Sequence, residues 1–445
     1  MKLKWIKWFF VLLLGVLAIL FMVNYPKLDI ISGFAAKSMA SNVFIGNRTT
    51  ESVIVNDHNV PLIKLAEVEI DQNQKSAYAN VYGLKNRKAI FRKGLGVVLV
   101  PEDFENQLTL FPNRVQILDT LPYPYGHNGI KDSIFEAIDY EVLNKAMDTA
   151  FSNPEVQKTR TVLVLYKGHL IAEKYIEDFG PDSPILGWSM TKSLLATLYG
   201  ILEYQGKLKV DDLAPIKEWQ NDARKNITLN HLLRMQSGLA WEEEYAGISD
   251  VTKMLFLDAD MTKAQAGKEA IAPPIEVWNY SSGTSNLLSG ILRMQFKTHQ
   301  EYLDFPYAAL IDKIGMHSML MEADAEGNFV GSSYGWASTR DWAKFGQLYL
   351  NKGNWNGEQL FSSEWVDYIS ESTPKSNGTY GAHFWLNANG KYPDVPKDLF
   401  SANGFQGQYV FVIPSKDLVV VRTGLAENPD FDINNFLKGL IKAIH

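Results

Sequence analysis

Ser189-Met190-Thr191-Lys192 leads directly into the apolar run Ser193–Leu202, and this stretch decides the prediction of the fold. The run is long and apolar enough to form a largely buried helix. Residues three apart share a helix face, so the lysine amine can reach the serine hydroxyl. In a dry site, burial lowers the pKa of a lysine until part of it is neutral and accepts a proton. The stretch therefore predicts a serine nucleophile paired with a lysine base.

The same spacing occurs a second time, at Ser372-Thr373-Pro374-Lys375. That copy contains a proline and continues into Lys375-Ser376-Asn377-Gly378, a sequence typical of a loop. The spacing of a serine and a lysine is therefore weak evidence, by itself, for a reactive site. The buried helix that follows Ser189 favours the first copy as the reactive one.

Composition excludes several classes of protein. The chain has 445 residues, 46% of them hydrophobic, which is enough for a large core. A net charge of -7 without a long basic run argues against a nucleic-acid partner. The absence of cysteine excludes disulfides and thiolate metal sites, and the eight histidines are scattered without a His-Glu-x-x-His run. We expect neither a metal nor a cofactor.

The first residues are typical of an export signal or a membrane anchor. Three lysines precede the unbroken apolar run Trp8–Val23, which Asn24–Lys27 closes. The best cleavage site, Gly33-Phe34-Ala35, lies too far after the apolar run for a signal peptide. Counted from Trp5, the apolar stretch is close to the length that spans a bilayer. We expect an uncleaved anchor with the rest of the chain outside. Secretion after cleavage is the alternative, and a buried core helix is the less favoured one.

Strand patterns stand at both ends of the larger part of the chain. Residues 161–175 and 408–422 both read as hairpins, and helical patterns dominate between residues 189 and 350. This order predicts an α+β fold in which one antiparallel sheet is flanked by helices and carries a mainly helical insert. We expect an anchor at 1–24, an N-terminal extension of unknown role at 25–130 and one domain at 131–445. Further helices are expected after Asp139, an N-cap candidate, and from Asp432 to Ile444.

A serine acyl-transfer site also needs a group that moves protons and donors for the oxyanion. Tyr280 precedes the apolar helix 285–292, and its phenol could relay protons with Lys192 because an ammonium beside a phenolate stabilises both charges. The alternative for this tyrosine is ordinary packing. The expected source of oxyanion donors is the turn Ser401–Gln408. Its Gly404 has no side chain to block the substrate, and the backbone N–H of the next residue would point toward the site.

The order of these motifs resembles the serine β-lactamases and penicillin-binding proteins, and within them the class C-like branch with esterases and 6-aminohexanoate-dimer hydrolases. The resemblance covers about residues 131–445 and implies a β-lactamase/transpeptidase-like fold. It implies Ser189 as the acylated nucleophile, Lys192 and Tyr280 as the proton-relay pair, and the N–H groups of Ser189 and Phe405 as the oxyanion hole. The motifs that carry it are Ser189–Lys192, Leu232–Leu239, Tyr280–Gly283, Gly331–Ser333, Asp341–Gly346 and Gly404–Gln408.

Two departures from the family pattern bear on the substrate. The tyrosine motif of β-lactam-processing members usually ends in Asn, and here it ends in the shorter Ser282. Their Lys-Thr-Gly strand reads Ala402-Asn403-Gly404 here, so the cation that pairs with a β-lactam or peptide carboxylate is missing. With Ser282, Asn403 and Gly404 as substrate-binding residues, we expect a small ester or amide as substrate, handled outside the bacterial cytoplasmic membrane.

Three rival functions remain open. A true β-lactamase or D-Ala-D-Ala peptidase is one, and a catalytically silent module that senses a ligand is another. The third is an α/β-hydrolase, because Gly331-Ser332-Ser333-Tyr334-Gly335 matches the nucleophile elbow of that class. Only Phe329-Val330 precedes it as a strand and the next helix starts late, so a turn is the simpler interpretation of the sequence around Ser333.

Overall fold

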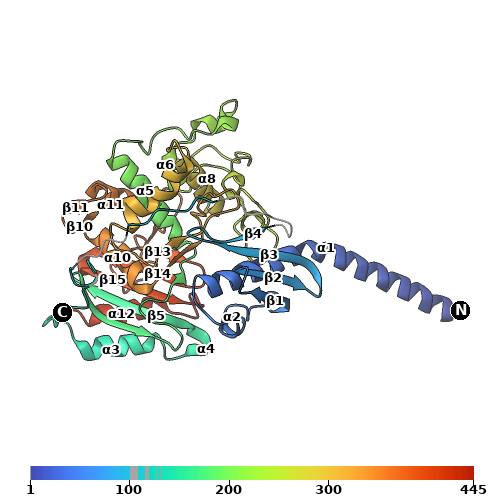
Figure 1. Ribbon diagram of the computed structural model, residues 1–445, viewed down its shortest axis with the longest axis horizontal. Coiled ribbons are helices and arrows are strands. Elements are labelled where there is room, and N and C mark those ends of the chain that lie inside the picture. Colours follow the sequence, from blue (N-terminus) through green and yellow to red (C-terminus); the bar gives the residue numbers. More distant parts are fainter. Residues whose placement is uncertain (1, 101–108, 116–119, 127, 132) are drawn as a thin grey trace.

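The computed structural model describes residues 2–100, 109–115, 120–126, 128–131 and 133–445, and its central layer is a six-stranded antiparallel sheet (Figure 1). The strand order is β12 (Trp385–Leu386), β13 (Phe400–Gly404), β14 (Gln408–Ile413), β15 (Leu418–Gly424), β5 (Thr159–Tyr166) and β6 (His169–Tyr175). Val421 of β15 lies opposite Leu163 of β5, so the two hairpins pair across a long stretch of sequence. The prediction that they share one sheet is confirmed.

Helices cover both faces of this sheet, which explains why its central strands read as continuous apolar runs. All eight residues of β5 are buried. Val162 and Val164 join the core under α3 (Tyr140–Thr149) and α12 (Ile433–Lys442). Leu163 and Leu165 join the larger core on the other face, with α5 (Met190–Tyr204) and α10 (Thr339–Leu350). The alternation along a strand therefore divides its side chains between two cores.

The segment between β6 and β12 is mainly helical, as the sequence predicts, and polar residues cap its helices in the usual way. Besides α5 and α10 it contains α6 (Leu229–Leu233), α7 (Asp250–Phe256), α8 (Ser282–Arg293), α9 (His299–Pro306) and α11 (Ser363–Ser370), with a π-helical turn at Tyr307–Ile311 and the short strands β7 (Ile185–Leu186), β8 (Leu320–Met321), β9 (Gly335–Ala337), β10 (Asn354–Trp355) and β11 (Glu358–Gln359). The predicted N-cap Asp139 accepts hydrogen bonds from the first turn of α3. Helix α4 (Pro154–Gln157) connects α3 to β5.

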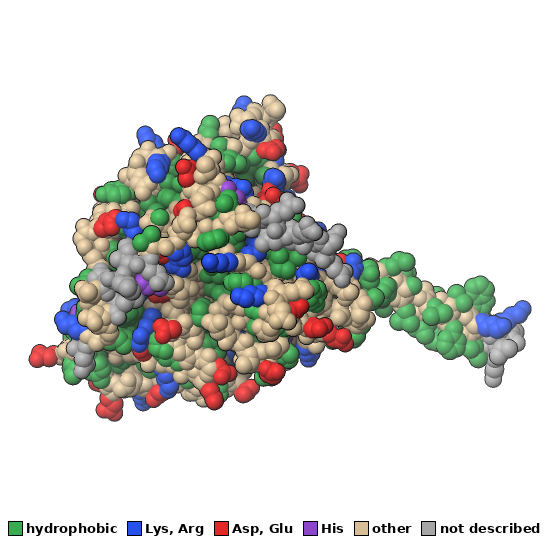
Figure 2. Space-filling model, in the orientation of Figure 1, with side chains coloured by type: hydrophobic (Ala, Val, Ile, Leu, Met, Phe, Trp, Pro, Cys, Tyr) green, Lys and Arg blue, Asp and Glu red, His purple; other side chains and the backbone are tan. Residues whose placement is uncertain are grey.

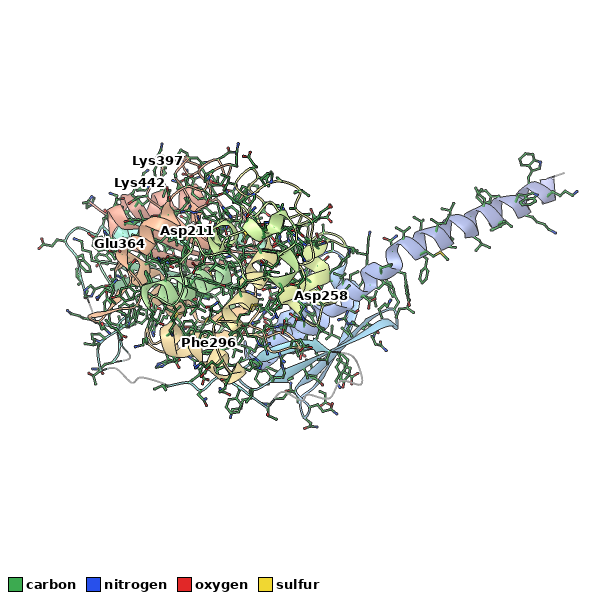
Figure 3. The ribbon with its side chains drawn as sticks, turned by 90° about the horizontal axis from the view of Figure 1, so that it is seen from above. Asp211, Asp258, Phe296, Glu364, Lys397 and Lys442 are labelled. Carbon is green, nitrogen blue, oxygen red and sulfur yellow. The ribbon has the colours of Figure 1, made fainter. Side chains whose placement is uncertain are left out.

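The first helix, α1, runs from Lys2 to Phe44 and extends well beyond the apolar run. The run closes at Asn24–Lys27, whereas the helix continues through Pro26. Its apolar stretch from Trp5 to Val23 is exposed and projects from the body in two perpendicular views (Figures 1 and 3). Figure 2 shows that apolar side chains cover this projection, whereas the body carries mixed charges. By length and composition, α1 is able to cross a membrane.

The second half of α1 packs on a separate four-stranded sheet, and this contact explains why the helix does not end at Pro26. The sheet order is β1 (Ala66–Asp71), β2 (Ser76–Val81), β3 (Leu84–Arg92) and β4 (Gly96–Val100), and helix α2 (Thr50–Asn56) precedes it. Small residues meet at the contact, with Ala36 and Ala40 of α1 in one core with Ala77 and Ala89. Their burial offsets the hydrogen bond that a proline removes from a helix.

A buried carboxylate joins the N-terminal residues to the rest of the chain. Glu322 accepts hydrogen bonds from Lys37 of α1 at 2.8 Å and from the indole of Trp336 at 2.7 Å. The N–H of Val97 in β4 donates to the same carboxylate at 2.6 Å. Residues from α1, β4 and β9 thus converge on one charge. The division at residue 130 stays a prediction, but α1 and β4 contact residues that follow it through Lys37 and Val97.

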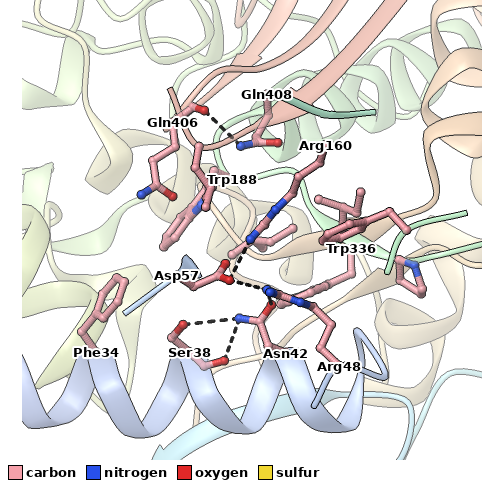
Figure 4. Close-up of a pocket in the computed structure, with 15 residues that line it drawn as sticks. Phe34, Ser38, Asn42, Arg48, Asp57, Arg160, Trp188, Trp336, Gln406 and Gln408 are labelled. Carbon is pink, nitrogen blue, oxygen red and sulfur yellow. Dashed lines mark hydrogen bonds and ion pairs between the residues drawn. The ribbon is translucent and has the colours of Figure 1, made fainter. Parts of the chain in front are cut away.

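A second polar cluster, drawn in Figure 4, lies between α2 and the central sheet. Asp57, the C-cap of α2, forms ion pairs with Arg48 and with Arg160 of β5, the latter at 2.7 Å. Burial alone raises the pKa of Asp57, yet the two guanidinium groups outweigh it and the pKa is lowered. The cluster is therefore ionised, and it connects the N-terminal segment to strand β5 of the central sheet.

Candidate active site

Ser189 stands at the junction between a strained loop and a buried helix. It is the N-cap residue of α5, and Trp188 before it has a φ of 47°. This left-handed conformation is costly for a bulky residue and is held here by aromatic packing. One turn later, the Nζ of Lys192 lies 3.0 Å from the Oγ of Ser189. The i, i+3 spacing therefore brings the two groups into hydrogen-bond contact.

Lys192 is almost completely buried, with 1% of its surface exposed. Its amine donates to the hydroxyls of Ser189 and Ser282, each at 3.0 Å, and to the carbonyl of Ser332 at 2.8 Å. Burial lowers its pKa to about 8, although the nearby carboxylate of Glu243 acts in the opposite direction. At neutral pH roughly a tenth of the lysine is then neutral and able to accept a proton.

Tyr280 is half-buried, lies just before α8 and is part of the same cavity wall as Ser189. The Nζ of Lys192 lies 4.9 Å from the centre of its ring. Burial and the charge of Glu243 raise the pKa of Tyr280 well above its ordinary value. The resting phenol is therefore protonated, which differs from the phenolate that we expected Lys192 to stabilise. Its ring also packs on Trp385 and Tyr380.

Glu243 is the residue at this site that sequence reasoning missed. Its carboxylate accepts hydrogen bonds from both the N–H and the hydroxyl of Ser282, and from the phenol of Tyr245 at 2.9 Å. Because Ser282 also contacts Lys192, the glutamate is connected to the lysine through one hydroxyl. It lies in the run Glu242-Glu243-Glu244, and nothing in the sequence distinguishes it from its two neighbours.

The predicted substrate-binding residues occupy different positions. Asn403 and Gly404 line a cavity of about 480 Å³ above Ser189, whereas Ser282 is fully buried and is not part of the cavity wall. Ser282 therefore connects Lys192 and Glu243 instead of facing a ligand. The Oδ1 of Asn403 is buried and has no hydrogen-bond partner among the described residues. Asn403 belongs to β13, the strand that borders the cavity.

At Gly404, strand β13 lies against the backbone of Gly187, two residues before Ser189. A Cβ at this position would lie 2.0 Å from the carbonyl oxygen of Gly187, so only glycine fits. This contact places Phe405 opposite Ser189. Among the described residues, the N–H groups of Ser189 and Phe405 have no backbone acceptor. Both are thus available as donors at the edge of the cavity, as an oxyanion hole requires.

The cavity, which we name the Ser189 cavity, is aromatic and acidic. Its wall includes the carboxylates of Glu243 and Glu427 and the amine of Lys391. The other lining residues are Ser189, Tyr245, Tyr280, Trp385, Tyr392, Asn403, Gly404, Phe405, Tyr409, Asn428 and Ile433. This composition suits a neutral or cationic ligand with apolar parts better than an anion.

The rival sites gain no support from the geometry. The hydroxyl of Ser333 is buried and contacts the hydroxyl of Ser332 at 2.8 Å. Both ring nitrogens of His383 are engaged elsewhere, with Ser285 and with the carbonyl of Leu233. A nucleophile elbow needs a histidine beside the serine, and among the described residues no histidine is hydrogen-bonded to Ser333. The second copy of the motif, at 372–375, lies in a turn. The described residues hold no group of three or more His, Cys, Asp or Glu that could bind a metal.

Fold and site together define a class of proteins. A β-lactamase-like hydrolase has an antiparallel sheet beside a buried helix that begins with Ser-x-x-Lys. It also has a tyrosine before a second helix and a glycine on the facing strand. A model of the beta-lactamase family matches residues 156–440, which is more than half of the chain, and the chain belongs to this family.

Individual relatives point in the same direction. The chain is 22% identical to a 6-aminohexanoate-dimer hydrolase of Paenarthrobacter ureafaciens over 305 residues, which are 61% of this chain and 74% of that protein. Among solved structures, a putative 6-aminohexanoate-dimer hydrolase from Bacillus anthracis has a TM-score of 0.54 at 21% identity, covering 76% of this chain and 87% of that one. A family VIII carboxylesterase has a TM-score of 0.52 at 14% identity, covering 70% and 98%. The similarity to the two structures shows the shared fold.

Proposed function

We propose that the protein is a serine hydrolase that forms an acyl-enzyme at Ser189 on a small ester or amide. The observation that carries this proposal is the contact of 3.0 Å between the Oγ of Ser189 and a buried lysine amine whose pKa is lowered to about 8. A lysine of ordinary pKa would be a cation and a poor base. Membership of the β-lactamase family supports the same reaction class.

In the proposed reaction, neutral Lys192 takes the proton of Ser189 while the Oγ attacks the carbonyl carbon of the substrate. The N–H groups of Ser189 and Phe405 stabilise the oxyanion. The proton then passes through Lys192 and the phenol of Tyr280 to the leaving alcohol or amine, whose bond to the carbonyl breaks. Water next attacks the acyl-enzyme with Lys192 as base, which releases the acid and restores the serine. We assign Ser189, Lys192 and Tyr280 the catalytic roles.

The walls of the Ser189 cavity support an uncharged substrate. Strand β13 presents Ala402, Asn403 and Gly404, so it offers no cation for a β-lactam or peptide carboxylate. The cavity wall carries two glutamates and one lysine, so it offers no unbalanced cation to attract a carboxylate. Asn403, with its unpaired Oδ1, could instead accept a hydrogen bond from an amide or hydroxyl of the substrate.

We further propose that residues 1–24 anchor the protein as a single-pass helix in the bacterial cytoplasmic membrane, with the catalytic part outside. The exposed apolar run of α1 and the lysines before it support this orientation. An intact chain that stays in membranes after alkaline carbonate extraction, and that external protease digests in spheroplasts, is the expected result. A shortened chain in the medium would instead indicate a cleaved signal.

The proposal is tested by labelling the full-length protein with a fluorophosphonate probe and locating the modified peptide by mass spectrometry. The expected adduct lies on Ser189. An adduct on Ser333, or none on any serine, would contradict the proposal, and the second outcome would favour a silent binding module. Ser189→Ala should abolish labelling and the hydrolysis of p-nitrophenyl butyrate, whereas the matched control Ser372→Ala should keep both. Fast hydrolysis of nitrocefin would contradict the substrate argument.

A further inference from the structure

A second cavity, which we name the α1 cavity, lies between the emerging part of α1 and the active site. It has a volume of about 360 Å³ and is lined almost entirely by apolar groups. Ile30 and Phe34 of α1 form one wall, and Leu255 and Phe256 of α7 form another. Ile248 closes it from the loop before α7. No part of the proposed reaction uses this cavity.

The α1 cavity shares a wall with the Ser189 cavity. Tyr245 and Phe405 line both, and their rings stack at 5.3 Å with an angle of 18°. Trp188, the residue before the nucleophile, lines the α1 cavity and contacts Phe405 edge-on at 5.7 Å. The two cavities therefore adjoin at one aromatic pair next to Ser189. The same Phe405 carries a proposed oxyanion N–H, so a carbonyl bound there would have its substituent beside this wall.

The outer part of the α1 cavity lies where α1 leaves the body. Lys27 lines it only four residues after Val23, the last residue of the exposed apolar run. Leu62, also in the lining, is 46% exposed. If the run spans a bilayer, the cavity opens at the interface, with the amine of Lys27 at the level of the lipid headgroups.

We propose that the α1 cavity binds the hydrocarbon chain attached to the scissile carbonyl, so that the preferred substrate is an ester of a medium- or long-chain acyl group drawn from the membrane interface. This inference rests on the proposed function and names its substrate class. An apolar cavity of about 150 Å³ is known to hold benzene. The α1 cavity is more than twice as large and has room for a chain of more than six carbons.

The alternative, that this space is only a packing defect, fits the lining less well. A packing defect would be closed on all sides. This cavity instead reaches the exposed Leu62 at one end and the Tyr245–Phe405 pair next to Ser189 at the other. Each methylene buried in it would favour binding by roughly three- to fourfold. A preference for longer acyl chains is therefore the measurable consequence.

The test compares p-nitrophenyl butyrate with p-nitrophenyl decanoate, using the full-length protein in lipid nanodiscs. We expect the wild type to have a kcat/KM at least tenfold higher for the decanoate. Ile248→Trp and Ile30→Trp fill the cavity from two different walls, and each should lower the decanoate-to-butyrate ratio at least tenfold. Val55→Trp, at an exposed position outside the lining, is the matched control and should keep the wild-type ratio.

The outcomes separate the two proposals. Hydrolysis of butyrate without a preference for decanoate, or an unchanged ratio in both tryptophan variants, overturns this inference and leaves the serine hydrolase intact. Failure of the wild type to hydrolyse either ester, together with an unlabelled Ser189, overturns the proposed function itself. If one tryptophan variant fails to fold, the other still decides the question, because the two residues lie on separate elements.

Discussion

At the residue scale, the proposed reaction requires Lys192 in its neutral form. Only the neutral amine can take the serine proton, and burial lowers its pKa to about 8. For a neutral ester we therefore expect kcat/KM to rise about tenfold per pH unit below pH 8 and to level off above it. A pH–rate profile between pH 5.5 and 9.5 measures this.

Lys192→Arg is the matched control for that profile, because a guanidinium keeps the positive charge but stays protonated throughout the range. This variant should be inactive at every pH. A wild-type rate that is constant between pH 6 and 9 would show that Lys192 is not the base.

Glu243 changes the pKa of the same lysine, to which it is connected through the hydroxyl of Ser282. Its carboxylate raises the pKa of Lys192 against the effect of burial, so Glu243→Gln should lower that pKa further. The acid limb of the pH–rate profile should then move to lower pH by about half to one unit. A smaller maximal rate is also expected, because Ser282 loses a charged acceptor.

Glu242→Gln is the control for this prediction, since Glu242 precedes Glu243 in the chain but is not part of the cavity wall. Its profile should match the wild type. A Glu243→Gln profile with an unshifted acid limb would contradict the electrostatic role and leave only a structural one.

At the scale of elements, the contact between β13 and the loop before α5 sets the position of the two proposed oxyanion donors. Gly404→Ala would place a methyl group 2.0 Å from the carbonyl of Gly187, and the strand has to move away. Loss of one well-placed oxyanion donor costs roughly a hundredfold or more in kcat. We expect Gly404→Ala to lower kcat by about that factor and to change KM less.

Steady-state kinetics with p-nitrophenyl butyrate provide the measurement. Gly180→Ala is the matched control, because a Cβ there would meet nothing within 4 Å. If Gly404→Ala kept its wild-type kcat, β13 would not supply an oxyanion donor.

At the scale of the whole molecule, the N-terminal residues and the catalytic half are joined by buried charges. Glu322 has no exposed side-chain surface, and Lys37 is its only basic ion-pair partner among the described residues. Removing one partner of a buried pair leaves an uncompensated charge. Lys37→Met should therefore lower the free energy of unfolding by about 3–5 kcal/mol.

Urea unfolding of the detergent-solubilised protein, followed by tryptophan fluorescence, measures this change. The double variant Lys37→Met/Glu322→Gln should recover part of the loss, because the buried carboxylate is gone. Lys263→Met, at an exposed ion pair, should leave the stability nearly unchanged. Equal stability of Lys37→Met and the wild type would show that α1 is not coupled to the catalytic half.

Local patterns predicted a large part of this molecule. The Ser-x-x-Lys helix start, the hairpins and the central helical region are all encoded by neighbouring residues, through periodicity, turn residues and caps. Pro26 is a local stop signal for a helix, yet α1 continues through it because the following alanines pack on a sheet.

Tertiary structure decided what distant residues do together. Glu243 looks like either of its neighbours in the sequence, and only folding places it against Ser282 and near Lys192. The pKa of Lys192 depends on burial by segments far along the chain, which no local pattern encodes. The α1 cavity likewise exists only because α1 packs beside α7. The sequence by itself therefore determined the reactive groups and their class, whereas their protonation and the shape of the space around them arise from long-range packing.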